Sequence, residues 1–180
     1  AAVTGSVEAL KQASFESLAA HSRFYLEACR AALAAGARLL VLPEIALTWR
    51  LKGHGTLGDA VPIPGEAPEP FAALAKEAGA TIALPVAERS AEGAFYNTGA
   101  GLGPQGLLGC YHKVHLATGE AESGLLPGEG VPVFDTPVGR LACNICMDSS
   151  AAESSRLAAL GGAEVLALEN SLAGWRAVAA

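Results

Sequence analysis

Glu44, Lys113, Glu120 and Cys146 have the residue types needed for nucleophilic catalysis by a thiol. Cys146 ends the apolar run 141–145, and polar residues and a predicted helix follow at once, so its thiol is expected at a helix N-terminus. There, backbone N–H groups and the helix dipole favour a thiolate and can hold an oxyanion. A carboxylate base and an ammonium group upstream would complete such a site.

Each of the three upstream residues also has an ordinary interpretation. Glu44 follows the continuous apolar run 38–43, which predicts a strand buried on both faces, and ligands bind at the carboxyl ends of such strands. Lys113 lies in an apolar hairpin strand, where it is either solvated or buried beside a carboxylate. Glu120 is one of several glutamates in the predicted loop 117–130. Taken singly, each is a solvated side chain, so the hypothesis depends on their combination.

Other motifs receive structural interpretations. Cys143 and Cys146 form a C-x-x-C pair, which could be a redox dithiol or half of a zinc site. Residues three apart on a strand point to opposite faces and no second pair exists, so Cys143 is predicted to be core. The glycine pattern at 101–106 resembles a dinucleotide-binding loop, but it contains proline and precedes a β-like segment, so we predict a hairpin turn. Ser149 and Ser150 suit helix capping.

Apolar periodicity and Gly/Pro punctuation predict a single α/β domain over residues 1–180, with a mixed sheet. The expected helices cover 15–35, 68–78 and 151–160. The expected strands cover 38–44, 81–86, 95–101, 107–114, 131–135, 141–146 and 163–168.

Composition excludes several classes of function. The chain has 180 residues, 51% of them hydrophobic, and a net charge of -6 without a basic cluster, so a nucleic-acid partner is not expected. Its apolar runs are too short to span a membrane, and no signal peptide is visible. Three of the four cysteines lie in strand-like or helical runs, so all four are expected to be reduced thiols, which favours a cytoplasmic location.

Three segments carry a resemblance to a known family: 42–44 (Leu-Pro-Glu), 111–116 (Tyr-His-Lys-Val-His-Leu) and 145–148 (Ile-Cys-Met-Asp). In this order they resemble the carbon–nitrogen hydrolases of the nitrilase superfamily. The resemblance extends over roughly residues 27–168 and includes further segments at 74–82, 96–100, 103–113, 126–141 and 162–166.

The resemblance implies a catalytic triad and a mechanism. Cys146 would be the nucleophile, Glu44 the general base and Lys113 the oxyanion stabiliser, with the backbone N–H of Met147 as a second oxyanion donor. Glu120 matches a further family glutamate that positions the lysine and substrate. The reaction would pass through a thioester and needs no metal or organic cofactor. Asp148 stands where nitrilases more often carry Glu, which favours linear amides or N-carbamoyl (ureido) compounds as substrates.

The resemblance also implies a nitrilase-like αββα sandwich that pairs into a homodimer. This chain departs from the pattern at Ala151-Ala152, where the family often has an aromatic residue and proline, and it shows no convincing strand before Phe15. The strands and helix expected after Leu168 are missing, so the sandwich is truncated at its C-terminal side. Two alternatives to a hydrolase are considered. The first is a non-catalytic fragment or pseudoenzyme that acts through another chain, and the second is a C-x-x-C thiol oxidoreductase.

Overall fold

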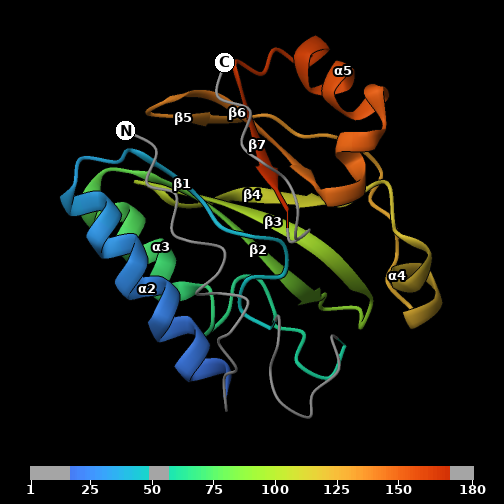
Figure 1. Ribbon diagram of the computed structural model, residues 1–180, viewed down its shortest axis with the longest axis horizontal. Coiled ribbons are helices and arrows are strands. Elements are labelled where there is room, and N and C mark those ends of the chain that lie inside the picture. The colour runs from blue at the N-terminus through green and yellow to red at the C-terminus, as the bar shows by residue number, and fades with distance from the viewer. Residues whose placement is uncertain (1–16, 49–56, 171–180) are drawn as a thin grey trace.

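The computed structural model of the chain describes residues 17–48 and 57–170, which form two β-sheets stacked between helices (Figure 1). The first sheet has the order β1-β2-β3-β4, and the second has the order β5-β6-β7. Each sheet contains one parallel pair, β1 with β2 and β6 with β7, and its other pairs are antiparallel. The predicted mixed α/β architecture is therefore confirmed.

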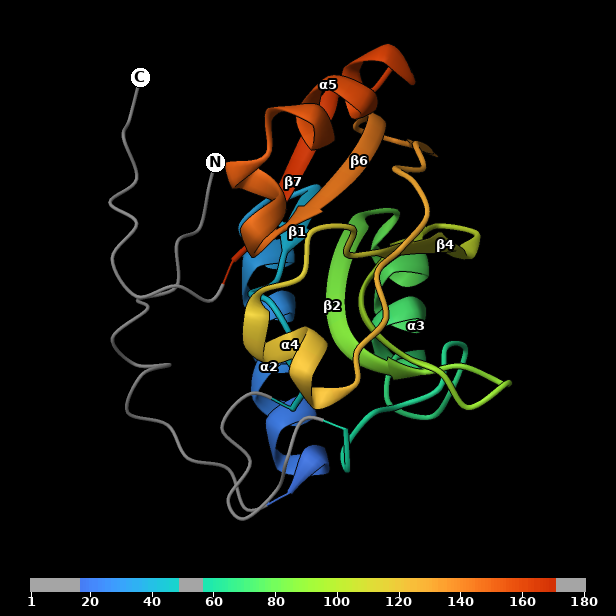
Figure 2. The same ribbon diagram turned by 90° about the vertical axis from the view of Figure 1, so that its right-hand side faces the viewer.

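The first sheet is covered on its outer face by two helices (Figures 1 and 2). Its strands and helices are α2 (Leu18–Ala34), β1 (Leu39–Val41), α3 (Glu69–Ala78), β2 (Thr81–Arg89), β3 (Phe95–Gly103) and β4 (Gly106–His112). Local sequence explains the helix ends. The Ser17 side chain accepts a hydrogen bond from the N–H of Ala20 at the start of α2. Pro70 lies in the first turn of α3, and Gly79, with φ +60°, ends it.

The second sheet lies against the other face of the first and carries the segment that contains Cys146. Its elements are β5 (Phe134–Thr136), β6 (Gly139–Ile145), the 3₁₀ helix η1 (Cys146–Ser150), α5 (Ala152–Leu160) and β7 (Val165–Glu169). Figure 2 shows α5 on the outer side of β6 and β7. The order of layers is helix, sheet, sheet, helix (Figures 1 and 2).

Two apolar clusters hold these layers together. One lies between the two long helices and the first sheet and includes Leu26, Phe71 and Leu84. The other lies between the sheets and includes Tyr111, Phe134, Leu141, Cys143 and Ile145. Burial of apolar surface on this scale is the main force that brings the sheets into contact.

Glycine permits this close approach of the sheets. A Cβ added at Gly101 or Gly109 would stand 3.0 Å or 2.7 Å from ring atoms of Phe134. Because neither position carries a side chain, the Phe134 ring lies directly on the β3–β4 hairpin.

Two expectations differ from the structure. The strand predicted over 38–44 is only three residues long, and it is not buried on both faces because β1 is an edge strand with Val41 41% exposed. The predicted loop 117–130 contains the short helix α4 (Thr118–Ser123). The segment before residue 17, and with it Phe15, lies outside the described residues, as does 171–180.

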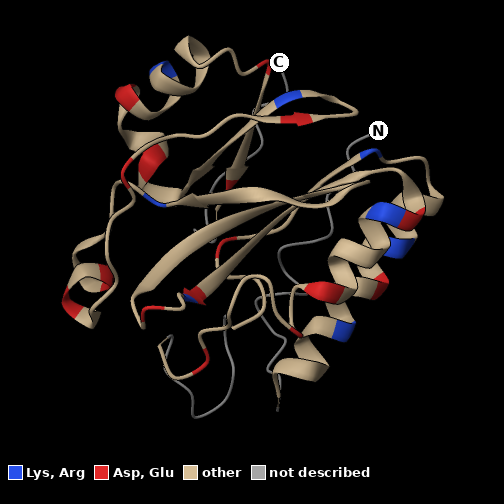
Figure 3. Ribbon diagram, turned by 180° about the vertical axis from the view of Figure 1, so that it is seen from behind, with Lys and Arg blue, Asp and Glu red and all other residues tan. Residues whose placement is uncertain are grey.

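The hairpin turn predicted at 101–106 is confirmed, since β3 and β4 pair antiparallel up to Gly103 and Gly106. Within the described ranges, no helix is long and apolar enough to cross a membrane. Charged residues of both signs lie along the covering helices, whereas the sheets carry few (Figure 3). Exposed leucines are found at positions 157 and 160 of α5 and 166 and 168 of β7.

Candidate active site

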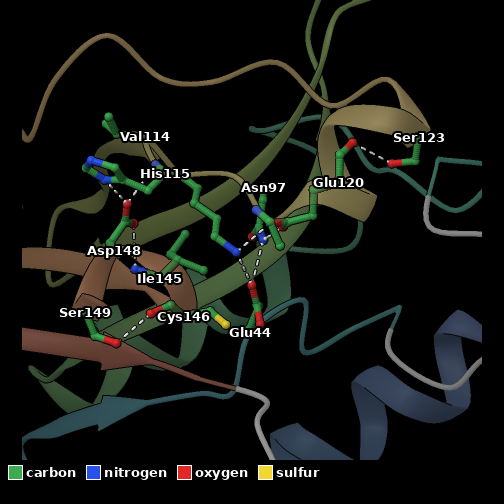
Figure 4. A network of polar contacts seen from close by, with 12 residues as sticks. Glu44, Asn97, Val114, His115, Glu120, Ser123, Ile145, Cys146, Asp148 and Ser149 are labelled. Atoms are coloured by element: carbon green, nitrogen blue, oxygen red, sulfur yellow. Dashed lines mark hydrogen bonds and ion pairs between the residues drawn. The ribbon is translucent and has the colours of Figure 1, made fainter. Parts of the chain in front are cut away.

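The structure brings the four predicted residues, Glu44, Lys113, Glu120 and Cys146, together between the two sheets (Figure 4). Glu44 lies in the turn directly after β1, and Lys113 directly follows β4. Glu120 is in α4, and Cys146 begins η1 at the end of β6. The first three residues come from the first sheet and its connections, and the thiol comes from the second sheet.

Lys113 is the centre of a buried ionic network. Its Nζ lies 2.7 Å from Glu44 Oε1 and 2.8 Å from Glu120 Oε2, and the side chain is 1% exposed. Burial alone would lower the pKa of Lys113, but the hydrogen bonds to Glu120 and Glu44 and their charges outweigh it, so its pKa is raised. The ammonium group is therefore charged at neutral pH. It has three donors, so after these two bonds one can serve a substrate oxygen.

Asn97 of β3 joins the same network, a role that sequence analysis missed. Its Nδ2 donates to Glu44 Oε1 at 3.0 Å and to Glu120 Oε1 at 2.7 Å. Glu120 also accepts from the N–H of Ala117 at 2.7 Å, which fixes the start of α4. Two neighbouring carboxylates are thus held by one ammonium group and neutral N–H donors. The short motif Tyr96-Asn97-Thr98 was visible in the sequence, but a single Asn in a strand carries no signal of its partners.

The backbone at Cys146 and beside Glu44 is unusual. Cys146 has φ +45°, and Ile45, next to Glu44, has φ +50°. Non-glycine residues rarely adopt this left-handed region, which costs about 1–3 kcal/mol and persists where the surroundings enforce it. Strain of this kind gathers at functional sites, and here it aims the thiol of Cys146 at the Glu44 carboxylate.

The expectation of a thiolate favoured by a helix dipole at Cys146 is wrong. The following helix, η1, has only five residues, so it contributes little dipole. Burial and the adjacent Glu44 carboxylate raise the pKa of Cys146 to about 11, and the Lys113 ammonium offsets this only in part. At neutral pH Cys146 is therefore a protonated thiol, and a thiol needs a base before it can act as a nucleophile.

Met147 directly follows the nucleophile in η1, and its side chain is exposed. The first N–H groups of a helix have no partner within the helix, which is the property expected of an oxyanion donor. The structure thus places the Met147 backbone next to the thiol.

Cys143 is fully buried between the sheets, as predicted for a core residue, and all four cysteines are free. Its thiol makes a side-chain hydrogen bond with Glu169 of β7, a fully buried carboxyl that no sequence signal marked. Neither Glu169 oxygen has a hydrogen-bonding N–H or O–H donor among the described residues. Within those residues, no group of three His, Cys, Asp or Glu side chains is placed to hold a metal ion.

A cavity of about 740 Å³ lies on the outer side of the first sheet. It is lined by α2, the segment 58–62, the start of α3 and Arg89. None of the four site residues lines it, so it is separate from the thiol centre.

Comparison with known proteins agrees with this architecture and with the order of the motifs. The model of the carbon-nitrogen hydrolase family matches residues 8–178. An omega-amidase of Xenopus laevis (NIT2-B) is 36% identical over 114 residues, which are 58% of this chain and 41% of that protein. A nitrilase of Pyrococcus abyssi is 35% identical over 136 residues, 73% of this chain and 51% of that protein. The chain thus spans about half the length of the curated relatives it matches.

Among solved structures, a mutant of the Nesterenkonia AN1 amidase from the nitrilase superfamily superposes with a TM-score of 0.74 at 22% identity. The match covers 90% of this chain and 63% of that one. The fold is therefore that of the nitrilase superfamily. Since the family model matches nearly the whole sequence, the chain belongs to the carbon-nitrogen hydrolase family.

Proposed function

We propose that this protein hydrolyses a non-peptide carbon–nitrogen bond, with Cys146 as nucleophile, Glu44 as general base and Lys113 as oxyanion stabiliser. The observation that carries the proposal is the Glu44 carboxylate, which contacts the Cys146 thiol and, through Oε1, the Lys113 ammonium at 2.7 Å. A base, a nucleophile and a fixed positive charge within one buried cluster are the parts that acyl transfer requires.

The first half of the reaction forms a thioester. Glu44 removes the thiol proton as Sγ attacks the substrate carbon, and the carbonyl oxygen becomes an oxyanion. The free N–H of the Lys113 ammonium and the Met147 backbone N–H receive this charge, each donor contributing about 3 kcal/mol. Glu44 then passes the proton to the nitrogen, the C–N bond breaks, and ammonia or an amine leaves.

The second half releases the acid. Glu44, again a carboxylate, removes a proton from a water molecule that attacks the thioester carbon. The same two donors hold the second oxyanion until the C–S bond breaks and the thiol recovers a proton from Glu44. Glu120 and Asn97 keep Lys113 and Glu44 in place throughout, since each contacts the network in the resting protein.

The substrate class we propose is a linear amide or an N-carbamoyl (ureido) compound. Asp148, two residues after the nucleophile, supports this choice over nitriles, and the Xenopus relative is an omega-amidase by name. We further propose that residues 1–180 belong to one catalytic domain, that the protein forms a homo-oligomer, and that it acts in the cytoplasm.

Ammonia release from a panel of amides, ureido acids and nitriles tests the function. The wild-type protein is expected to release ammonia from one class, and Cys146→Ala to release none. Trapping an acyl adduct of Cys146 by mass spectrometry would identify both the nucleophile and the acyl group. Equal ammonia release by both proteins would contradict the proposal.

Cys143→Ser is the matched control for the thiol. It removes a buried sulfur without touching the ionic network, so activity should persist. If activity were lost in Cys143→Ser and kept in Cys146→Ser, the thiol oxidoreductase alternative would gain support. A folded wild-type protein without activity on any substrate would favour the pseudoenzyme alternative.

A further inference from the structure

Asp148 lies at the junction between the nucleophile turn and the segment that carries Lys113. Its side chain is fully buried, and its two oxygens accept hydrogen bonds from three residues in two segments of the chain. Figure 4 shows the contacts with Ile145 and His115. Oδ2 accepts from the N–H of Ile145 at 2.9 Å and from the Tyr111 hydroxyl at 2.6 Å. Oδ1 accepts from the N–H of His115 at 2.9 Å and lies 3.0 Å from His115 Nδ1.

These partners surround the two reacting groups in the sequence. Ile145 directly precedes the nucleophile, whereas Tyr111 and His115 lie two residues before and two residues after Lys113. One carboxylate therefore ties the second sheet, at the point where it presents the thiol, to the first sheet, at the point where it presents the ammonium group.

The donors are fixed in their roles. Burial, and then the hydrogen bond to Asp148, raise the pKa of Tyr111, so its phenol remains a donor over the whole working range. His115 Nδ1 lies against a carboxylate oxygen, which assigns the ring proton to that nitrogen. Ser154 Oγ of α5, 3.0 Å from the same nitrogen, orients the ring.

The backbone of the nucleophile needs such a support. Cys146 has φ +45°, and this conformation persists only if neighbouring groups enforce it. The Ile145 N–H to Asp148 bond closes the turn around Cys146, and Ser149 Oγ donates to the Cys146 carbonyl at 2.6 Å.

We propose that Asp148 is a positioning residue that sets the distance and direction between the Cys146 thiol and the Lys113 ammonium. The inference rests on the proposed function, because it concerns the geometry of that reaction. Asp148 acts through the backbone and does not touch the substrate.

The test is Asp148→Asn, which keeps the side-chain volume. It replaces one carboxylate oxygen, an acceptor, with an NH₂ group that faces the N–H or O–H donors of its partners. We expect kcat per folded active site to fall about 100-fold, with KM changed less than about threefold, because a displacement of about 1 Å costs on that order. The amount of folded protein is measured by near-UV circular dichroism and by gel filtration, and kcat is expressed per folded molecule. A merely structural role would reduce the number of folded sites and leave kcat per site unchanged.

Two further variants make the result decisive. Tyr111→Phe removes one bond to Asp148 and is expected to lower kcat about threefold to tenfold, even if Asp148→Asn fails to fold. Ser155→Ala removes a bond to Asn144 elsewhere on α5 and should leave kcat unchanged. Folded Asp148→Asn with kcat per site within twofold of wild type would overturn the inference, as would unchanged kcat in Tyr111→Phe.

Failure of the proposed function is recognised separately. If Cys146→Ala retains activity, the assumed nucleophile is wrong, whatever Asp148→Asn does. If Cys146→Ala is inactive and Asp148→Asn is fully active, only the positioning role is refuted.

Discussion

Replacing Glu169 with glutamine is expected to stabilise the fold increasingly as the pH rises. Glu169 ends β7 and is fully buried between the sheets. Its Oε2 would stand 2.6 Å from a Cβ added at Gly99, so the carboxyl lies directly on the β3 backbone. Burial raises the pKa of Glu169 to about 8, and the carboxylates of Glu44 and Asp148 add to the effect, whereas the Cys143 thiol opposes it.

The expected magnitude follows from the difference between this pKa and the ordinary value of 4.5. A carboxyl whose pKa is raised by folding contributes its full stability below about pH 4.5 and loses it as the pH rises towards 8. The cost is about 1 kcal/mol at pH 5, about 3 kcal/mol at pH 7 and about 4 kcal/mol at pH 8. Glutamine has the same shape as the protonated acid and cannot ionise, so the variant escapes this cost.

Urea unfolding of both proteins at pH 5, 6, 7 and 8 measures the effect. The difference in free energy of unfolding between Glu169→Gln and wild type should grow by about 3 kcal/mol from pH 5 to pH 8. Any fixed cost of burying the amide is the same at each pH and cancels from this slope. A difference that stays constant with pH would refute the reasoning, because it would mean that Glu169 does not titrate in this range.

Three further outcomes are expected. Alkylation of Cys146 by iodoacetamide should accelerate up to about pH 11, because its thiol ionises late; a plateau near pH 7 would contradict this. Asn97→Ala removes the amide that joins the Glu44 and Glu120 carboxylates, so kcat for ammonia release should fall roughly 10–100-fold. An unchanged kcat would exclude a role for this amide in catalysis. Gly128→Ala places a methyl group against the His112 carbonyl, so the free energy of unfolding measured in urea should fall by about 3 kcal/mol. Gly130→Ala, with open space around it, is the matched control, and its free energy of unfolding should fall by less than about 1 kcal/mol.

The sequence predicted those features that depend on local pattern or on matching motifs. Pro70 and Gly79 bracket α3, and glycines mark the β3–β4 turn, because proline and glycine restrict or free the backbone wherever they occur. Glu44, Lys113 and Cys146 were identified through a resemblance that spans most of the chain. The structure brings their side chains together, as that resemblance implied.

Features that depend on neighbours distant in sequence could not be predicted. The raised pKa of Cys146 arises from burial and from Glu44, a residue about a hundred positions away. Asn97 and Asp148 each belong to a recognisable motif, but their partners are known only once the sheets are stacked. The edge position of β1 was missed for the same reason, since an apolar run does not reveal which strand lies on its other side.

The division of the reacting groups between two stacked sheets has a consequence for biosynthesis. Residues 39–112 emerge from the ribosome before the second sheet and can pair into β1–β4, with the face that bears Tyr111 still open. That apolar face is covered only when β6 and β7 arrive, so the nascent chain exposes an aggregation-prone surface in the interval. Ammonia release regained on refolding would therefore report the last event, the docking of one sheet on the other, and should lag behind the recovery of secondary structure.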